Sequence, residues 1–308
     1  MDSLTLHTAD GQTLAARCFT PSAGVVKRVV VIATALGVPQ VFYWDHARWL
    51  TQHGCAVITF DWRGMGLSAP QVLRGYRADL MDWAERDAPA VLDEAARRFP
   101  GVPISWFGHS MGGILFGAIP PHPAVDRVVT IAAGHGHRDW LARPLRYYVG
   151  LLWHVAMPWS IKRHGYFAGR RLRALGDMPA GVALQWRRWA LHPDFVVSHS
   201  AQVREAYASV RTPMTVVTLT DDTLATGEGV RRHHAHYTQA PQTHVRLRPR
   251  DHGVRRLHAH YTHAPQTHVR LRPRDHGVNR VGHFDFFRAS CGKPIWPQAL
   301  GWLRGDAT

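Results

Sequence analysis

Residues 103–119 read PISWFGHSMGGILFGAI and contain the pattern G-x-S-x-G between two segments of different character. The short apolar run PISWFG is typical of a buried strand, and the small residues of GGILFGAI suit a closely packed helix. At such a sharp strand-to-helix turn, Gly108 and Gly112 relieve crowding while Ser110 presents its hydroxyl above a sheet. The context predicts that Ser110 is a nucleophile and that the backbone N–H of Met111 donates to an oxyanion.

Further apolar runs typical of strands lie on both sides of this turn and alternate with helix-like segments. The predicted strands are 27–33, 55–60, 103–108, 124–133 and 212–220, and the predicted helices are 47–54, 77–99 and 112–119. Two alternating segments, SLTLHT and TLAARCF, precede them and are joined by the turn ADGQ. This order favours an α/β fold with a mostly parallel central sheet, helices on both faces and an antiparallel N-terminal hairpin.

The alternation is interrupted in residues 134–210. This stretch has no clear buried strand, its Arg/Trp/Leu spacing is helical, and it contains Trp140, Trp153, Trp159, Trp186 and Trp189. We expect a core domain formed by residues 1–133 and 211–308, with 134–210 inserted as a helical cap or lid over a pocket. The alternative is a helical excursion that only packs on the sheet.

A serine hydroxyl is a poor nucleophile without a base, so the chain should supply a histidine and an acid further along. TDDTLAT follows the strand predicted at 212–220, which places Asp221 and Asp222 at the carboxyl end of a strand, where open α/β sheets hold their sites. NRVGHFDFF, near the C-terminus, contains His283. The order serine, aspartate, histidine is the one expected for this architecture, with either aspartate as the acid.

These features together resemble the α/β-hydrolase superfamily, and the resemblance covers nearly the whole chain. FDWRGMGLS at 60–68 is similar to the superfamily's D-x-R-G-x-G-x-S loop after the fourth strand. The segments 33–44 (ATALGVPQVFYW), 175–195 and 281–288 (VGHFDFFR) are most similar to a group of predicted bacterial serine hydrolases of the esterase and serine aminopeptidase type.

The resemblance implies that Ser110 is the nucleophile, His283 the general base and Asp222 the orienting acid, with Asp221 as the second choice. DTLAT matches the superfamily's D-x-x-x-P segment, with Thr226 where Pro is common.

The oxyanion hole departs from the superfamily's pattern on one side. Many relatives carry His-Gly after the third strand, whereas this chain reads ATALGV. Because backbone N–H groups donate there, Ala35 or Leu36 is expected to be the second donor beside Met111.

The implied reaction is hydrolysis of a carboxylic ester through an acyl-enzyme on Ser110, with a small-molecule acyl substrate and no cofactor or metal. Thioesterase, amidase and peptidase activities are alternatives within the same chemistry. A non-catalytic small-molecule binder with this fold is the rival from another class, because fold does not fix function.

A 24-residue unit occurs twice in succession near the C-terminus. Residues 229–252 read GVRRHHAHYTQAPQTHVRLRPRDH, residues 253–276 read GVRRLHAHYTHAPQTHVRLRPRDH, and they differ only at His233/Leu257 and Gln239/His263. Each unit predicts a helix followed by a short strand, which an α/β hydrolase needs once between its acid and its histidine. We therefore interpret 229–276 as a tandem duplication within the core.

Two arrangements of the repeat are open. In the first, the helix of the first unit follows Asp222, the strand of the second unit leads to His283, and roughly 243–264 is looped out or added at the sheet edge. In the second, the helix and strand of the second unit are both used and most of the first unit is extruded.

The formal charge of +15 raises the question of nucleic-acid binding. The excess is Arg spread along the chain, and each repeat unit holds five Arg and one Asp, so the two units supply +8. We therefore expect no nucleic-acid partner. HHAH at 233–236 lacks the spacing of a structural zinc site, and three cysteines form no disulfide framework.

No signal peptide is expected from the polar start MDSLTLHTADG, and the apolar run 145–161 is too short and interrupted to span a membrane. The sequence thus predicts a cytoplasmic protein, and it leaves the oligomeric state open.

Overall fold

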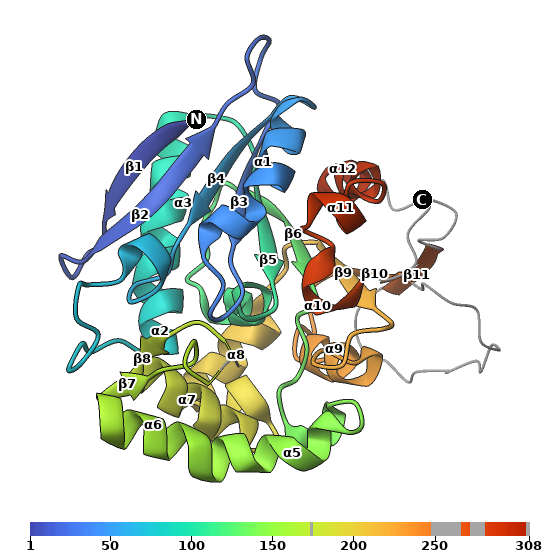
Figure 1. Cartoon of the computed structure of the whole chain (residues 1–308). Helices are drawn as coiled ribbons and strands as arrows, with labels where there is room; N and C mark the ends of the chain where they lie inside the picture. Colours follow the sequence, from blue (N-terminus) through green and yellow to red (C-terminus); the bar gives the residue numbers. More distant parts are fainter. Residues whose placement is uncertain (173–174, 248–265, 272–280, 306–308) are drawn as a thin grey trace.

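The fold is a central sheet with helices around it (Figure 1). The computed structural model describes residues 1–172, 175–247, 266–271 and 281–305. In this part of the chain, nine strands form one sheet in the order β1-β2-β4-β3-β5-β6-β9-β10-β11. Their bounds are β1 Asp2–His7, β2 Thr13–Phe19, β3 Arg28–Ala33, β4 Cys55–Phe60, β5 Ile104–His109, β6 Val125–Ile131, β9 Met214–Leu219, β10 Gln242–Leu247 and β11 Gln266–Leu271.

The sheet is antiparallel only at its N-terminal end. β1 and β2 form the predicted hairpin, β2 pairs antiparallel with β4, and the remaining neighbours pair in parallel. β4, β5 and β9 are buried at every position, as expected for parallel strands covered on both faces. The predicted α/β architecture is confirmed.

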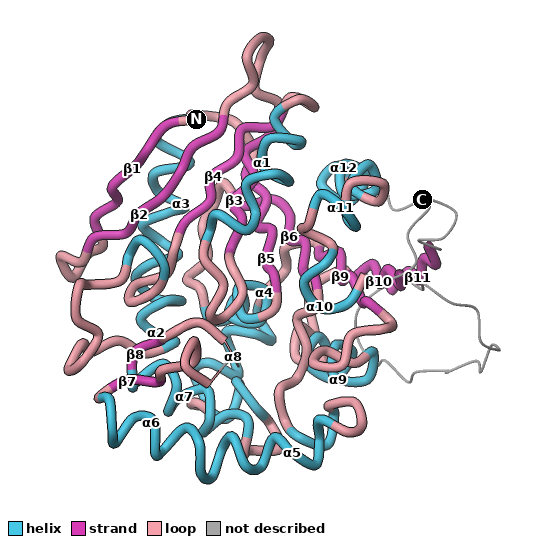
Figure 2. The backbone as a smooth tube through the Cα atoms, in the orientation of Figure 1, coloured by secondary structure: helices cyan, strands magenta, loops and turns pink. Residues whose placement is uncertain are grey.

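The helices cover both faces of this sheet (Figure 2). α1 and α12 pack together through His46 and Trp296, and α8 and α9 contact each other through Tyr207 and His233. The bounds are α1 Trp44–Thr51, α2 Leu80–Asp82, α3 Ala88–Arg98, α4 Met111–Ile114, α5 Leu145–Leu151, α6 Met157–His164, α7 Ala180–Ala190, α8 Ala201–Ser209, α9 Gly227–His234, α10 Gly282–Asp285, α11 Ala289–Gly292 and α12 Trp296–Arg304.

The segment between β6 and β9 is helical, and α5, α6 and α7 lie together at one end of the sheet (Figure 1). A π-helical turn, η6 (Leu152–Ala156), joins α5 to α6 into one long helical segment. A small antiparallel pair, β7 (Tyr166–Phe167) and β8 (Met178–Pro179), interrupts the helices and escaped the sequence analysis because each strand has two residues.

The first repeat unit supplies both α9 and β10. β10 lies between β9 and β11, and β11 of the second unit pairs with it in parallel at the sheet edge, with Gln242 opposite Gln266 and Leu247 opposite Leu271. The expectation that the first helix follows Asp222 is confirmed. For residues 243–247, the expectation of a loop or an edge position is wrong, because they lie in β10, which is internal to the sheet. The rest of that expected loop, 248–264, lies outside the described residues.

Extrusion of the first unit is wrong for the same reason. The physical cause is chain connectivity, because β9 is closest in sequence to the first unit and pairing with it closes the shorter loop. The helix expected in the second unit lies outside the described residues.

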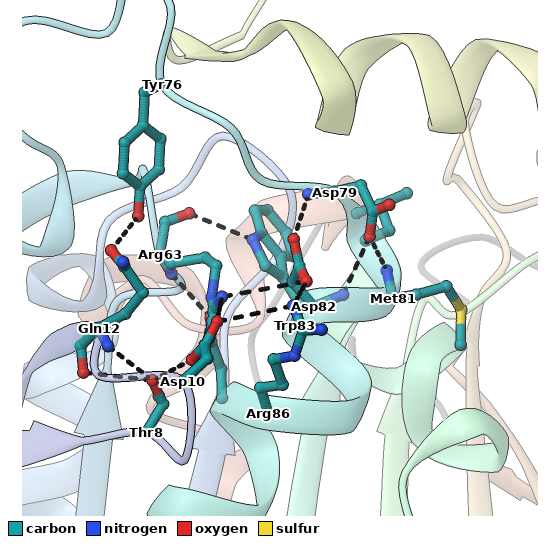
Figure 3. Close-up of polar contacts among 12 residues, drawn as sticks. Thr8, Asp10, Gln12, Arg63, Tyr76, Asp79, Met81, Asp82, Trp83 and Arg86 are labelled. Atoms are coloured by element: carbon teal, nitrogen blue, oxygen red, sulfur yellow. Dashed lines mark hydrogen bonds and ion pairs between the residues drawn. The ribbon is translucent and has the colours of Figure 1, made fainter.

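Arg63, in the loop that follows β4, is held by buried ion pairs (Figure 3). Its Nε lies 2.7 Å from Oδ1 of Asp87, and its Nη1 lies 2.6 Å from Oδ2 of Asp10 in the β1–β2 turn. Burial raises the pKa of the Asp87 carboxyl to about 7, although the charge and hydrogen bonds of Arg63 act to lower it. The loop is thereby fixed beside the sheet.

Candidate active site

Ser110 lies at the tip of a strained turn between β5 and α4. Its backbone has φ 50° and ψ −116°, a region that side chains other than glycine rarely adopt. The turn is closed by hydrogen bonds, since Ser110 N–H donates to the Ile131 carbonyl at 2.9 Å and the Ser110 carbonyl accepts from Gly113 and Ile114. The strain is therefore maintained by the surrounding sheet and helix.

The two glycines of the pattern are required by close backbone contacts. A Cβ atom on Gly108 would lie 2.5 Å from the Cα of Gly113, and one on Gly112 would lie 2.3 Å from the carbonyl oxygen of Ala33. Both distances are far inside van der Waals contact. The pattern thus reflects how tightly β3, β5 and α4 meet.

Asp222 is hydrogen-bonded to His283. Oδ2 of Asp222 lies 2.6 Å from Nδ1 of His283, and Oδ1 accepts the backbone N–H groups of Leu224 at 2.8 Å and Ala225 at 2.9 Å. The carboxylate is buried, and these contacts fix its orientation. Asp221 points elsewhere, because its Oδ2 accepts the backbone N–H of Val281 at 2.9 Å.

Ser110 and His283 line the same cavity, which has a volume of about 330 Å³. No hydrogen bond joins these two described side chains in this structure. The shared cavity wall is therefore what brings the serine hydroxyl and the imidazole into one site.

His109, beside the serine, makes a buried hydrogen-bond chain that the sequence did not reveal. Burial lowers the pKa of His109 well below its usual value, so the ring is neutral. Its Nε2 lies 2.8 Å from the His283 carbonyl and must carry the hydrogen, which leaves Nδ1 to accept from the Tyr43 hydroxyl at 2.8 Å. The Tyr43 oxygen in turn accepts the Ala35 backbone N–H at 2.9 Å.

These hydrogen bonds, from Ala35 through Tyr43 and His109, connect the segment after β3 with the backbone of His283. They also distinguish the two predicted oxyanion donors, because the N–H of Ala35 is already used by Tyr43. Leu36 and Met111 both line the cavity, and their backbone N–H groups have no acceptor within the described residues. Tyr43 and His109 lie in segments that the sequence analysis quoted, but no spacing rule joins residues 66 positions apart.

The described residues contain no group of three or more His, Cys, Asp or Glu side chains arranged to hold a metal ion. Within the same ranges, no helix is both long enough and apolar enough to cross a membrane.

Comparison with solved structures shows the fold. An esterase from Exiguobacterium antarcticum is 13% identical, with 98% of this chain and 100% of that chain covered at a TM-score of 0.58. A serine hydrolase described as lacking a lid, from Xanthomonas campestris, is 14% identical, with 99% and 94% covered at 0.52. The thioesterase domain of a curacin biosynthetic pathway is 15% identical, with 97% and 99% covered at 0.53.

Comparison with curated proteins finds no match. A sequence model of the family described as "Serine aminopeptidase, S33" matches residues 24–254, which include the serine turn, the segment between β6 and β9, and the first repeat unit. The match ends two residues inside the second unit, so it covers β10 and excludes β11, in agreement with the internal position of β10. The chain therefore belongs to the S33 serine aminopeptidase family of α/β hydrolases.

Proposed function

We propose that this hydrolase cleaves carboxylic esters that have an apolar acyl group, through an acyl-enzyme on Ser110. The observation that carries the proposal is the cavity, in which Ser110 and His283 contribute the only hydroxyl, carboxyl or imidazole groups among the described lining residues. His283 is oriented by Asp222 through the 2.6 Å hydrogen bond.

In the first half of the reaction, the Ser110 hydroxyl oxygen attacks the ester carbonyl carbon and its proton passes to Nε2 of His283. The carboxylate of Asp222 holds the Nδ1–H of that ring and stabilises the imidazolium. The backbone N–H groups of Met111 and Leu36 donate to the oxyanion. Collapse of the tetrahedral intermediate expels the alcohol, which takes the proton from His283.

In the second half, water attacks the acyl-enzyme and gives a proton to His283. The acid product leaves when the bond to Ser110 breaks and His283 returns the proton to the serine oxygen.

We also propose that residues 134–210 act as a cap over this core. The residues of this segment that line the cavity are apolar, and they are Gly134, Gly136, Leu141, Leu145, Val149, Leu152, Trp153, Leu175, Trp186 and Phe195. The volume of about 330 Å³ lies at the small end of ligand sites, which favours a short or medium acyl chain.

The cavity argues against an aminopeptidase substrate. Recognition of a free amino terminus in an apolar site requires a buried negative partner, because an unpaired ammonium group is costly to desolvate. The described lining contains no Asp or Glu, since the Asp222 carboxylate is engaged behind His283.

The test is a substrate panel with the purified full chain. We expect p-nitrophenyl esters of short to medium acyl length to be hydrolysed faster than aminoacyl p-nitroanilides. The panel also includes acyl thioesters. Ser110→Ala should reduce kcat by at least about 10⁴-fold, whereas Ser290→Ala, an exposed serine outside the cavity, should retain activity.

A second matched pair tests the acid. Asp222→Asn should reduce kcat by about 10⁴-fold, and Asp221→Asn should reduce it far less because its carboxylate bonds the Val281 backbone. Faster turnover of the aminoacyl anilides than of the esters would refute the substrate class, and full activity of Ser110→Ala would refute the nucleophile.

A further inference from the structure

The helical segment formed by α5, η6 and α6 exposes large apolar side chains along its outer face. The exposed fractions are 62% for Tyr147, 68% for Tyr148, 63% for Leu151, 54% for Val155 and 57% for Trp159. Four of these positions are spaced by four residues, which puts them on one side of a helix. Such a stripe is unusual on a protein surface and marks an interaction site.

The opposite face of the same segment is also apolar. Val149, Trp153 and Met157 are buried, and the first two line the cavity. The outer stripe is therefore not a core face that the fold left incomplete. A helical segment with apolar side chains on two opposite faces can bury the outer one only against something outside the fold.

The charge around this segment identifies the class of partner. Residues 140–176 contain seven Arg or Lys residues and no Asp or Glu. Arg143 lies before the stripe, Lys162 and Arg163 lie after it, and all three are exposed. Interfacial helices combine Tyr, Trp and Leu with Lys and Arg in this way because the rings enter the headgroup boundary while the cations meet anionic lipid.

We propose that the outer face of α5, η6 and α6 docks on an anionic phospholipid surface. The five exposed apolar side chains enter the boundary between headgroups and acyl chains, and the flanking basic side chains contact lipid phosphates. The segment lies on the surface and does not cross it. Because the inner face of this segment lines the cavity, docking brings one wall of an apolar site next to a source of apolar esters.

The experiment is sedimentation of the full chain with vesicles of phosphatidylcholine, with and without phosphatidylglycerol. We expect binding to the anionic vesicles to be at least about tenfold stronger at low ionic strength and to weaken as salt is added. Leu151→Ser with Trp159→Ser should weaken binding about tenfold or more. Lys162→Glu with Arg163→Glu should remove the preference for phosphatidylglycerol.

The matched control is Val25→Ser with Val72→Ser, since these apolar side chains are 83% and 67% exposed and lie elsewhere on the molecule. This control should bind vesicles like the wild type. The Leu151/Trp159 variant should keep its melting temperature and its turnover of a soluble short ester, because neither residue lines the cavity.

Equal loss of binding in the control and in the Leu151/Trp159 variant would overturn the proposal, as would failure of the wild type to bind anionic vesicles. Self-association that the Leu151/Trp159 variant abolishes, without vesicle binding, would show that the stripe is a protein interface and would also overturn it. Vesicle binding is measured equally well with Ser110→Ala, so failure of the esterase proposal is distinguishable.

Discussion

The two sides of the cavity are built in opposite ways. On the serine side, β5, Ser110 and α4 are so close that a single added carbon on Gly112 would lie 2.3 Å from a carbonyl oxygen of β3. On the aspartate–histidine side, two strands of identical sequence, β10 and β11, lie next to each other in register. The serine turn has room for only one backbone arrangement. The sheet edge, by contrast, holds the same six-residue sequence in two neighbouring strands.

The difference shows that close local packing determines the structure in one region, whereas the position of a segment along the chain determines it in the other. At the serine turn, local geometry leaves no alternative. At the sheet edge, six residues that are the same in both units become an internal strand or an edge strand according to which unit reaches β9 first. The following predictions test this contrast.

The largest effect is expected at the serine turn. Gly112→Ala should destabilise the fold by more than about 3 kcal/mol, because the added methyl group meets backbone atoms that cannot move aside. Gly150→Ala in α5 is the matched change, since open space surrounds that position, and it should be neutral or stabilising by up to about 1 kcal/mol. Urea unfolding of both variants measures the difference, and equal stabilities would contradict the steric explanation.

The next effect compares the same substitution in the two repeat units. Val245→Asp in β10 places a carboxyl group at a position with 0% exposure and should destabilise the protein by about 3 kcal/mol or more. Val269→Asp, the equivalent change in β11, should have a smaller effect because that strand lies at the sheet edge. Thermal melting of the two variants checks this order. The reverse order would mean that the second unit provides the internal strand.

Acid should destabilise the folded protein through its buried histidines. Burial lowers the pKa of His46 to about 3 and of His234 to about 4, and it lowers those of His109 and His233 well below the usual value. In the unfolded chain these rings bind protons below about pH 6.5, so the folded state loses stability as the pH falls from about 6.5 towards the folded pKa values. The slope is about 1.4 kcal/mol per pH unit for each ring.

Urea unfolding between pH 8 and pH 5 measures this slope. His233→Leu should reduce it by the contribution of one ring, and the difference from wild type cancels groups of opposite sign such as Asp87. An unchanged slope would show that His233 binds protons equally well in the folded and unfolded states.

The smallest effect distinguishes two nearly identical deletions. Removing 229–252 or 253–276 leaves chains that differ only where His233 is replaced by Leu and Gln239 by His. His233 is fully buried, and neither ring nitrogen has a hydrogen-bond partner among the described residues. Leu avoids that unsatisfied burial, so the chain lacking 229–252 should be more stable by about 1–3 kcal/mol.

Differential scanning calorimetry should then show a melting temperature higher by at least about 2–4 °C for that chain. Both deletions keep one helix and one strand, so both should retain ester hydrolysis. A more stable chain after removal of 253–276 would mean that His233 gains a partner when β11 is absent.

Much of the fold was predictable because strands and helices are local patterns. The runs around β3 to β6 and β9, the hairpin at the N-terminus and the G-x-S-x-G turn all carry their own signal in neighbouring residues. The location of the second repeat strand did not follow from local patterns, because the two units carry the same strand signal and differ only in their distance along the chain from β9. The bridge from Tyr43 through His109 to His283 was missed for another reason, since it depends on three segments that meet only in the folded chain.

In-register pairing of β10 and β11 also affects how this part of the protein can evolve. A unit that is copied whole and placed at an open sheet edge can be added without moving Asp222 or His283 relative to each other, as their 2.6 Å contact shows. The inner copy is then constrained by its buried neighbours, while the outer copy can accumulate changes or be lost in one recombination event. Strands can therefore be gained or lost at this edge without disturbing the residues proposed to carry out the reaction.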